Sequence, residues 1–330
     1  MQDQEAMARA VELAASVRAV TSPNPWVGAV VLTADGRVFE GATEPPGGRH
    51  AEIVALDRAG AAARGSTVVV TLEPCCHHGR TPPCTDALLS AGVARVVGAV
   101  PDPDERVAGR GFERLRQAGV EVVTGVGADE VARQLAPYLK HRRTGRPFVT
   151  LKLAATIDGR IAAPDGSSKW ITGEAARRDA HQLRATNDAV LVGSGTVRAD
   201  DPELTVRLVP GRDPRRVVLG TAPAGARVHP ALEVSGDPVD ALDELGRQGV
   251  LSLLVEGGGR VAHSFHGAGL VDLYVLYLAA AIMGGHDGKP MFDGPGAGTM
   301  SEVWRGRLLA VERLGDDIRV DLAPARAEAA

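Results

Sequence analysis

The residues best suited to chemistry lie between His50 and Cys84, where one histidine and one glutamate precede a cluster of cysteines. One imidazole and two thiolates can hold a tetrahedral Zn²⁺ and leave its fourth position to water. A carboxylate that is not itself a ligand can take a proton from this water and return it to a leaving group. We therefore predict a hydrolytic zinc site in which His50, Cys75 and Cys84 bind the metal and Glu52 moves the proton.

The elements expected around these residues would bring the ligands together. Residues 51–56 are predicted to form a helix, which places His50 at its first turn. Residues 67–72 are predicted to form a strand that delivers Cys75 to a turn. A second helix is expected from Cys84 onward, and the N-terminus of a helix favours a thiolate through its dipole. Two helix starts that face each other would place the three ligands around one metal.

Two less reactive interpretations of the motif remain open. The cysteines could simply pack, or the zinc could be structural, with His77 or His78 as a fourth protein ligand. We favour catalysis because a structural site has no use for Glu52, and because a His-x-Glu triplet followed by Pro-Cys is typical of zinc-dependent nucleobase deaminases. The spacing between Cys75 and the second cysteine ligand is longer here than in that pattern. Cys76 is expected to be a bystander.

The composition limits the partners of the chain. Its 330 residues suggest two domains that each bury a core. A net charge of −4 and an aromatic content of 3% provide neither an electrostatic nor a stacking surface for nucleic acid. All three cysteines lie in the metal motif, no signal-peptide pattern opens the chain, and its most apolar stretch, 271–283, is too short to span a membrane. We therefore expect a cytoplasmic protein with neither nucleic-acid nor membrane partners.

A proline-rich turn precedes the first predicted strand. Ser22-Pro23-Asn24-Pro25 follows an expected helix at 4–20 and fixes an extended turn. Asn24 is exposed between the two prolines. It is either a turn residue or an amide that faces the edge of a pyrimidine, and the sequence alone leaves these roles equal.

Helices and strands are expected to alternate along both halves of the chain. In the first half, strands are predicted at 95–100 and 120–124, with helices at 105–118 and 128–141. This alternation predicts an α/β fold with a largely parallel sheet and helices on both faces. The polar segment 142–147 is the expected boundary, which gives two domains, residues 1–144 and 145–330.

Two glycine-rich turns in the second domain suggest a nucleotide site. Gly193-Ser194-Gly195-Thr196 follows one predicted strand, and Glu256-Gly257-Gly258-Gly259-Arg260 follows another and opens a helix. Backbone N–H groups at such turns can hold a phosphate, although many glycines of this kind only form turns. Arg184 and Arg207 could also bind a phosphate, although lone arginines are more often solvated.

Motifs in both domains resemble those of a known family. The first domain carries Ser22-Pro23-Asn24-Pro25, His50-Ala51-Glu52 and the run from Pro74 to Cys84. The second domain carries the runs 150–162, 168–172, 193–202 and 255–258. In content and order, over nearly the whole chain, they resemble the bifunctional deaminase/reductase of riboflavin biosynthesis.

This resemblance implies a fold and two activities. The first domain would be a cytidine-deaminase-like αβα sandwich that uses Zn²⁺ to hydrolyse the amine from 2,5-diamino-6-(5-phosphoribosylamino)pyrimidin-4-one. The second would be a dihydrofolate-reductase-like α/β domain. With NADPH it would reduce the ribosyl chain to ribityl, which gives 5-amino-6-(5-phosphoribitylamino)uracil. The resemblance also implies a homo-oligomer, either a dimer or a tetramer.

Site residues follow from the same resemblance. His50, Cys75 and Cys84 would bind zinc, and Glu52 would be the proton shuttle. Lys152 would lie beside the ribose carbon that receives hydride. The contacts with NADPH would come from Ala154, Trp170, Thr196, Asp200, Gly258 and Gly259. The contacts with substrate would come from Asn24, Arg80, Ser168, Arg184, Leu204, Arg207 and Glu256.

Thr43 departs from the family's pattern, and two alternative functions deserve a test. Thr43 stands where members of the family often carry a histidine, and Glu44 is a candidate substitute. One alternative function is a cytidine or tRNA deaminase with an accessory domain, which the acidic net charge and low aromatic content weaken. The other makes the second domain a nucleotide-binding module without activity, against which the presence of Lys152, Asp200 and Glu256 argues.

Overall fold

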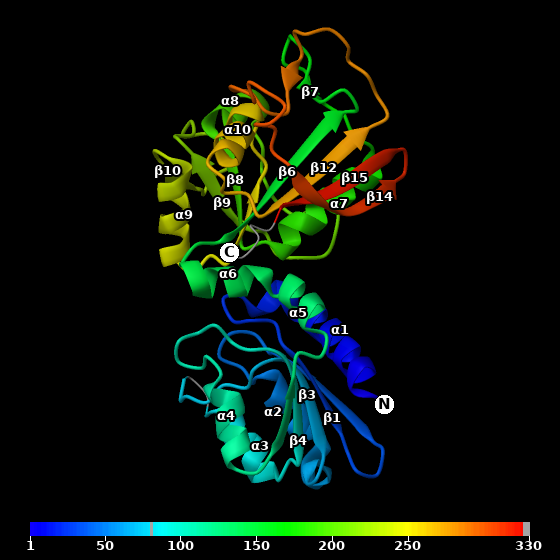
Figure 1. Cartoon of the computed structure of the whole chain (residues 1–330). Helices are drawn as coiled ribbons and strands as arrows, with labels where there is room; N and C mark the ends of the chain where they lie inside the picture. The colour runs from blue at the N-terminus through cyan, green and yellow to red at the C-terminus, as the bar shows by residue number, and fades with distance from the viewer. Residues whose placement is uncertain (80–81, 326–330) are drawn as a thin grey trace. The chain divides into compact units, whose positions relative to one another are not determined.

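The computed structural model describes residues 1–79 and 82–325 and divides into two compact units, Met1–Gly145 and Arg146–Ala330 (Figure 1). Each unit has its own sheet and its own core. Because no sheet contains strands from both units, each unit is described by itself.

A five-stranded mixed sheet forms the centre of unit 1. Its order is β2-β1-β3-β4-β5. The strands span Gly28–Leu32 (β1), Val38–Ala42 (β2), Thr67–Leu72 (β3), Arg95–Val100 (β4) and Glu121–Thr124 (β5). β1 is antiparallel to both β2 and β3, whereas β3, β4 and β5 run parallel. The valines of β3 and β4 are buried, as expected for parallel strands covered on both faces.

Helices cover both faces of this sheet. They span Asp3–Thr21 (α1), Ala51–Ala59 (α2), Cys84–Ala91 (α3), Arg110–Gln117 (α4), Ala128–Gln134 (α5) and Ala136–Thr144 (α6), with a 3₁₀ turn at Gly60–Ala63 (η1). A Cβ atom at Gly28 would lie 1.9 Å from the Ala10 carbonyl oxygen, and one at Gly41 would lie 2.2 Å from that of Ala51. Gly41 pairs with Ala29, so Gly28 and Gly41 point to opposite faces. The two glycines therefore admit α1 and α2 on opposite sides, which makes the unit an αβα sandwich.

Two predicted helices of unit 1 differ in the structure. The helix expected at 105–118 begins only at Arg110, because the carboxylate of Glu73 accepts hydrogen bonds from backbone N–H groups at its start and fixes the preceding residues as turns. The helix expected at 128–141 is two helices that meet at Leu135. Pro137 at the start of the second lacks the N–H that a continuous helix needs.

An eight-stranded sheet runs through unit 2. Its order is β10-β9-β8-β11-β6-β12-β15-β14. The strands span Phe148–Thr156 (β6), Ala189–Gly193 (β8), Arg215–Leu219 (β9), Leu232–Val234 (β10), Ser252–Val255 (β11), Leu273–Ala279 (β12), Gly306–Leu314 (β14) and Asp317–Pro324 (β15). The first six in this order are parallel, and the β14–β15 hairpin is antiparallel. A separate small sheet pairs Arg160–Ala162 (β7) with Lys289–Pro290 (β13).

The helices of unit 2 pack on this sheet. They span Glu174–Thr186 (α7), Ser194–Asp200 (α8), Pro238–Arg247 (α9) and Gly259–Gly267 (α10). α8 and α10 begin at the carboxyl ends of β8 and β11, which are neighbours, so both helix N-termini lie at one edge of the sheet. The sequence predicts only a glycine-rich turn at residues 193–196. In the structure these residues open α8 instead.

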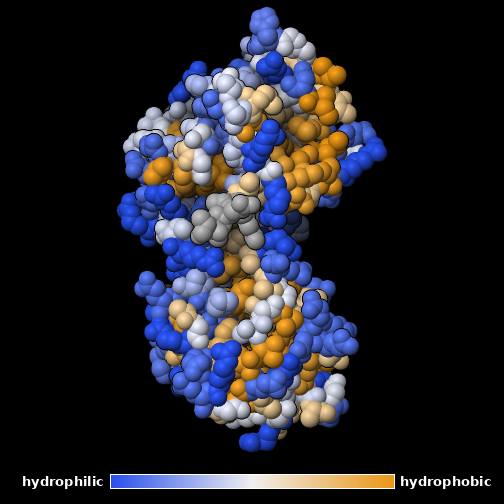
Figure 2. All heavy atoms as spheres, in the orientation of Figure 1, coloured by the Kyte–Doolittle hydropathy of each residue, from blue (hydrophilic) through white to orange (hydrophobic). Residues whose placement is uncertain are grey.

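The last strands leave an apolar surface uncovered. β14 is the edge strand, and its Leu308, Leu309 and Val311 are 58%, 42% and 60% exposed. In Figure 2, apolar surface gathers over β12, β15 and β14. Among the helices of the described residues, none is both long and apolar enough to cross a membrane.

Candidate active sites

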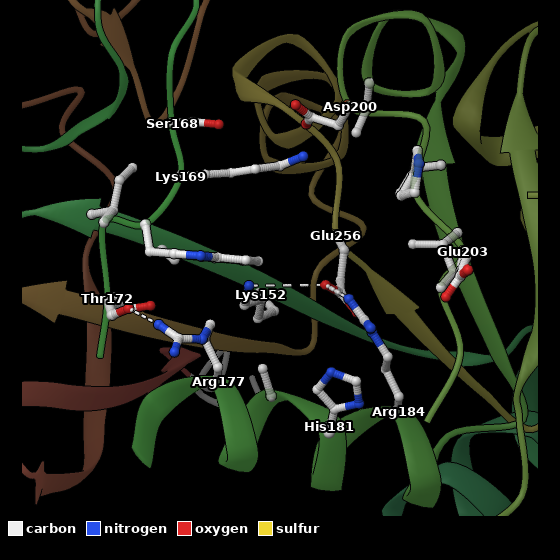
Figure 3. Close-up of a pocket in the computed structure, with 18 of the residues that line it drawn as sticks. Lys152, Ser168, Lys169, Thr172, Arg177, His181, Arg184, Asp200, Glu203 and Glu256 are labelled. Atoms are coloured by element: carbon white, nitrogen blue, oxygen red, sulfur yellow. Dashed lines mark hydrogen bonds and ion pairs between the residues drawn. The ribbon is translucent and has the colours of Figure 1, made fainter. Parts of the chain in front are cut away.

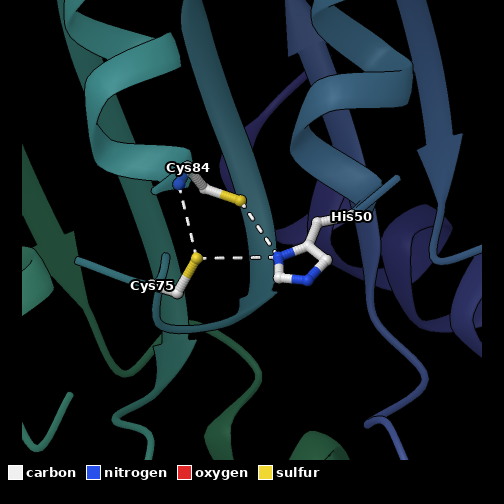
Figure 4. A group of neighbouring side chains, drawn as sticks. All are labelled: His50, Cys75 and Cys84. Atoms are coloured by element: carbon white, nitrogen blue, oxygen red, sulfur yellow. Dashed lines mark hydrogen bonds between the residues drawn. The ribbon is translucent and has the colours of Figure 1, made fainter. Parts of the chain in front are cut away.

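The three predicted zinc ligands meet in unit 1 (Figure 4). His50 is the residue before α2, Cys75 follows β3, and Cys84 is the first residue of α3. The Nδ1 atom of His50 lies 3.2 Å from Sγ of Cys84 and 3.6 Å from Sγ of Cys75. The backbone N–H of Cys84 donates to Sγ of Cys75 at 3.3 Å, so the start of α3 faces the second thiol.

The spacing of these atoms fits zinc. A tetrahedral ion with ordinary Zn–N and Zn–S bonds separates nitrogen from sulfur by about 3.5 Å. Within the described residues, the group of close metal-ligating atoms contains His50, Cys75 and Cys84 and no fourth side chain. His77 and His78 do not belong to it, and the thiol of Cys76 lies 3.6 Å from the Arg106 carbonyl instead. This open set is typical of a catalytic zinc site.

A cavity of about 320 Å³ adjoins the ligands. Glu52 lies in its wall, on the first turn of α2, and only 4% of its surface is exposed. Burial raises the pKa of the Glu52 carboxyl above its ordinary value, and the His50 imidazole acts in the opposite direction. A raised pKa makes a carboxyl a better proton acceptor than an ordinary one, which suits a proton shuttle.

The other residues of unit 1 that the sequence singled out do not all lie at this cavity. Asn24 borders the same cavity as Glu52. Thr43 also borders it, and its hydroxyl accepts a hydrogen bond from the backbone N–H of Val27 at 3.1 Å. Glu44 is not among the residues that border the cavity, and it pairs with Arg49 at 2.5 Å. Arg80 lies outside the described residues.

A buried carboxylate, which the sequence analysis missed, organises one wall of this cavity. Glu73 is 3% exposed and accepts four backbone hydrogen bonds of 2.8–3.2 Å. The donors are the N–H groups of Asp102, Gly109, Gly111 and Phe112. Since Glu73 lies two residues before Cys75, this network ties the segment 102–112 to the metal ligands. In the sequence Glu73 is marked only by its place in the Glu-Pro-Cys run that carries a metal ligand, and this run does not indicate its hydrogen-bond partners.

Asp102 also borders the cavity, and the sequence analysis missed it too. Its two carboxylate oxygens each lie 3.1 Å from the Tyr138 hydroxyl, and Oδ1 accepts from the N–H of Asp104 at 2.9 Å. Burial raises the pKa of Asp102 to about 6, against the opposing effect of these hydrogen bonds. The aspartate therefore titrates within the working range of an enzyme.

A second cavity, of about 670 Å³, opens in unit 2 (Figure 3). It lies at the carboxyl edge of β8, β11 and β6, where open α/β sheets bind ligands. Most residues that the resemblance assigned to this domain border it, namely Lys152, Ala154, Ser168, Trp170, Arg184, Thr196, Asp200, Leu204, Arg207, Glu256 and Gly258.

Gly259, which the resemblance also assigned to this domain, does not border the cavity. It is buried at the start of α10, where a Cβ atom would lie 2.6 Å from the Pro290 carbonyl oxygen, so its missing side chain admits a neighbouring segment. Gly258 is the residue before α10 and does face the cavity. Trp170 is 72% exposed although it borders the cavity. A helix N-terminus and an uncovered aromatic ring fit a dinucleotide such as NADPH.

Three charged side chains form a buried network in the cavity. Arg184 donates from Nε to Oε1 of Glu256 at 2.5 Å and from Nη2 to Oε2 at 2.9 Å. Nζ of Lys152 lies 3.8 Å from Oε2 of Glu256. Burial lowers the pKa of Lys152, and Arg184 adds to this effect while Glu256 opposes it. Burial acts to raise the pKa of Glu256, but Arg184 and then Lys152 lower it to about 2, so this residue is an anion.

Arg207 and Leu204 come from a segment without regular secondary structure. Leu204 is buried with φ at 56°, a left-handed conformation that is unusual for leucine. The guanidinium of Arg207 is half-exposed and lies 2.7 Å from Oε2 of Glu203 and 2.5 Å from Oγ1 of Thr205. His181 and Arg177 of α7 also border the cavity and were not identified in the sequence.

Comparison with known protein families covers both units. The model of the cytidine and deoxycytidylate deaminase zinc-binding region matches residues 1–100, and that of the RibD C-terminal domain matches residues 147–320. The riboflavin biosynthesis protein RibD of Mycobacterium tuberculosis (strain H37Rv) is 44% identical, with 96% of each chain covered. The RibD protein of Escherichia coli (strain K12) is 39% identical over 98% of this chain and 100% of the relative.

Solved structures agree with these matches. Acinetobacter baumannii RibD (form 1) superposes with a TM-score of 0.92 at 38% identity, over 98% of this chain and 99% of that one. The Thermotoga maritima diaminohydroxyphosphoribosylaminopyrimidine deaminase/5-amino-6-(5-phosphoribosylamino)uracil reductase gives 0.89 at 34% identity, with the same coverage. With a zinc-binding deaminase domain and a reductase domain along nearly its full length, the chain belongs to the RibD family of bifunctional, zinc- and NADPH-dependent deaminase/reductases of riboflavin biosynthesis.

Proposed function

We propose that the cavity of each unit performs one of the family's two reactions, with the residue roles given below. The observation that carries the proposal is the meeting of His50, Cys75 and Cys84 beside the buried carboxyl of Glu52. The charged network of Lys152 in the second cavity supports a separate reaction there.

In unit 1 the reaction is hydrolytic deamination of 2,5-diamino-6-(5-phosphoribosylamino)pyrimidin-4-one. Zinc, when bound by His50, Cys75 and Cys84, lowers the pKa of water to about 7 and so supplies a nucleophile near neutral pH. Glu52 takes the proton of this water and delivers it to the departing amine, which leaves as ammonia. The amide of Asn24 both donates and accepts hydrogen bonds, so it can hold the pyrimidine edge within the same cavity.

In unit 2 the reaction is reduction of the ribosyl chain to ribityl. NADPH, when bound, would supply the hydride that reduces the former anomeric carbon of the ring-opened substrate. The ammonium of Lys152 lies on the rigid strand β6, where it can orient the open chain and release a proton to the substrate nitrogen. Glu256 and Arg184 hold that ammonium in a charged environment, and its lowered pKa makes the proton easier to give.

The remaining residues of the second cavity bind the two ends of the ligands. Arg207 would bind the 5-phosphate of the substrate, because a planar guanidinium forms paired hydrogen bonds with phosphate oxygens. Ser168 and Leu204 would line the substrate side. Gly258 and the N-terminus of α10 would hold phosphate groups of NADPH, with Ala154, Thr196 and Asp200 alongside and Trp170 covering a ring.

The uncovered face of β14 supports a homo-oligomer. An edge strand presents unpaired backbone groups that a second copy can pair by antiparallel addition, and Leu308, Leu309 and Val311 add apolar surface. We propose self-association of unit 2 through this strand. The reducing cytoplasm fits a zinc site built from free thiols.

One experiment tests the function of both cavities. The purified protein is incubated with the diaminopyrimidine substrate, with and without NADPH, and the products are identified by mass spectrometry. We expect the deaminated ribosylamino product without NADPH and the ribitylamino product with it. Reduction without prior deamination, or deamination that requires NADPH, would contradict the assignment of one reaction to each cavity.

A further inference from the structure

His181 lies between the charged network of the reductase cavity and the segment that carries Arg207. It is on α7, 7% exposed, and borders the cavity. Its Nδ1 atom lies 3.0 Å from the backbone nitrogen of Arg207. A backbone N–H is always the donor in such a pair, so Nδ1 accepts and the ring proton of the neutral imidazole is on Nε2.

The surroundings keep this imidazole neutral. Burial lowers the pKa of His181 to about 4, and the nearby guanidinium groups of Arg184 and Arg207 add to the effect. Glu256 raises the pKa and Lys152 lowers it, each less strongly. Figure 3 shows the ring beside Arg184, with Lys152 and Glu256 above it. A neutral Nδ1 remains a hydrogen-bond acceptor throughout the neutral pH range.

The segment from Glu203 to Arg207 has no helix or strand to satisfy its backbone. Side chains do this instead. Arg184 donates to the carbonyl of Thr205 at 3.1 Å, and Asp213 accepts from the N–H of Val206 at 2.7 Å. His181 accepts the third hydrogen bond, from the backbone N–H of Arg207. Two of these three bonds therefore come from α7, so this helix fixes the wall of the cavity that carries the phosphate-binding residue.

We propose that His181 is a positioning residue of the reductase, which fixes the backbone of Arg207 through Nδ1 and thereby sets affinity for the 5-phosphate of the substrate. The inference rests on the proposed phosphate-binding role of Arg207. It assigns no proton transfer to His181, because the ring is neutral and its inner nitrogen is engaged with the backbone.

Two amide substitutions distinguish the roles of the two ring nitrogens of His181. The oxygen of asparagine occupies nearly the position of Nδ1, whereas the amide of glutamine reaches the position of Nε2. His181→Leu removes both. We expect His181→Leu and His181→Gln to raise the KM for the phosphorylated substrate by roughly three- to thirtyfold with kcat little changed, because a buried N–H loses its acceptor. His181→Asn should restore most of the affinity.

A double substitution shows whether His181 acts through Arg207. Because both changes act on one contact, His181→Leu combined with Arg207→Ala should raise KM no more than Arg207→Ala alone. A dephosphorylated substrate should be bound equally by wild type and by His181→Leu. Thermal unfolding of the same samples reports whether unit 2 has kept its fold, and their deamination activity serves as a control for the amount of active protein.

The outcomes are distinct. If His181→Gln retains affinity and His181→Asn loses it, the contact through Nε2 is the important one and the inference is wrong. Additive effects in the double variant would also overturn it, as would a fall in kcat with unchanged KM. If Arg207→Ala itself leaves KM unchanged, then the proposed role of Arg207 has failed, which is a separate result from failure of the His181 tether.

Discussion

At the scale of single residues, the reductase cavity is organised by one shared carboxylate. Glu256 forms a bidentate pair with Arg184 and lies near Lys152, so two cations share one anion in a buried site. A buried charge that loses its partner is costly, which keeps the three side chains together. Burial lowers the pKa of Lys152, and Arg184 adds to this effect while Glu256 opposes it, so the ammonium is less firmly protonated than that of a surface lysine.

Substitution of Lys152 should affect the chemical step, whereas substitution of Arg207 should affect substrate binding. Lys152→Met removes the ammonium beside the reacting carbon and should mainly lower kcat for reduction. Arg207→Ala removes a contact present equally in ground and transition states, so it should raise KM about ten- to a hundredfold, the value of a charge-assisted hydrogen bond. Steady-state kinetics with pre-deaminated substrate measures both. Zinc content and deamination serve as controls, and the reverse pattern of kcat and KM would refute the assignment.

At the scale of elements, an irregular loop and the helix start that follows it shape one wall of the deaminase cavity. Residues 102–109 and the first turn of α4 are held by four backbone hydrogen bonds to Glu73, and Tyr138 of α6 reaches the loop through Asp102. A Cβ atom at Gly111 would lie 2.1 Å from the Pro74 carbonyl oxygen, so the start of α4 packs directly against the metal-binding segment. Stability of this wall and integrity of the zinc site are thus linked.

Ionisation of Asp102 should oppose folding of unit 1. Its pKa is about 6 in the folded chain against an ordinary 3.8, so the folded state holds a proton that the unfolded state has released between these values. Stability from this group falls as pH rises from about 4 to about 6, and the penalty, on the order of 2–3 kcal/mol, persists above. Asp102→Asn cannot ionise and keeps an acceptor for Tyr138. Its stability relative to wild type should therefore increase across this range.

Urea unfolding followed by the fluorescence of Trp26 measures this difference. Trp170 and Trp304 belong to unit 2 and are replaced by phenylalanine in both proteins, which leaves Trp26 as the reporter of unit 1. A difference in unfolding free energy that stays constant with pH would show that Asp102 titrates normally.

The sequence predicted these elements unevenly, for physical reasons. The valine-rich strands β3 and β4 and the helix starts at His50 and Cys84 carry local signals, and the ligands follow from them. The bonds of Glu73 and the His181 tether join residues far apart in the chain, so no local pattern indicates them. α8 was missed because its Ser-Gly-Thr start is a poor helix former, and packing beside β8 decides its conformation.

At the scale of the whole molecule, two sheets serve two chemistries. The zinc ligands and Glu52 all belong to Met1–Gly145, and the charged network of the reductase belongs to Arg146–Ala330. Within the described residues, neither cavity takes a lining residue from the other unit. Damage to one site should therefore leave the other chemistry intact.

Glu52→Gln tests this independence. The amide keeps the size of the side chain but cannot accept a proton, so deamination should fall by roughly 10²–10⁴-fold. Zinc should remain, because Glu52 is not among the ligands, and reduction of pre-deaminated substrate should be nearly unchanged. Metal analysis and two separate activity assays check these three expectations. An equal loss of both activities would point to a shared site.

The proposed self-association through β14 has a consequence for how the chain is inactivated by heat. If unit 2 self-associates through β14 as proposed, a copy without its partner would expose an apolar strand with an unpaired backbone edge, which is a template for disordered aggregation. Substitutions in this strand would then appear as irreversible thermal inactivation and precipitation, with turnover of the remaining protein unchanged. Thermal inactivation would also slow at higher protein concentration, since association protects the edge that starts it.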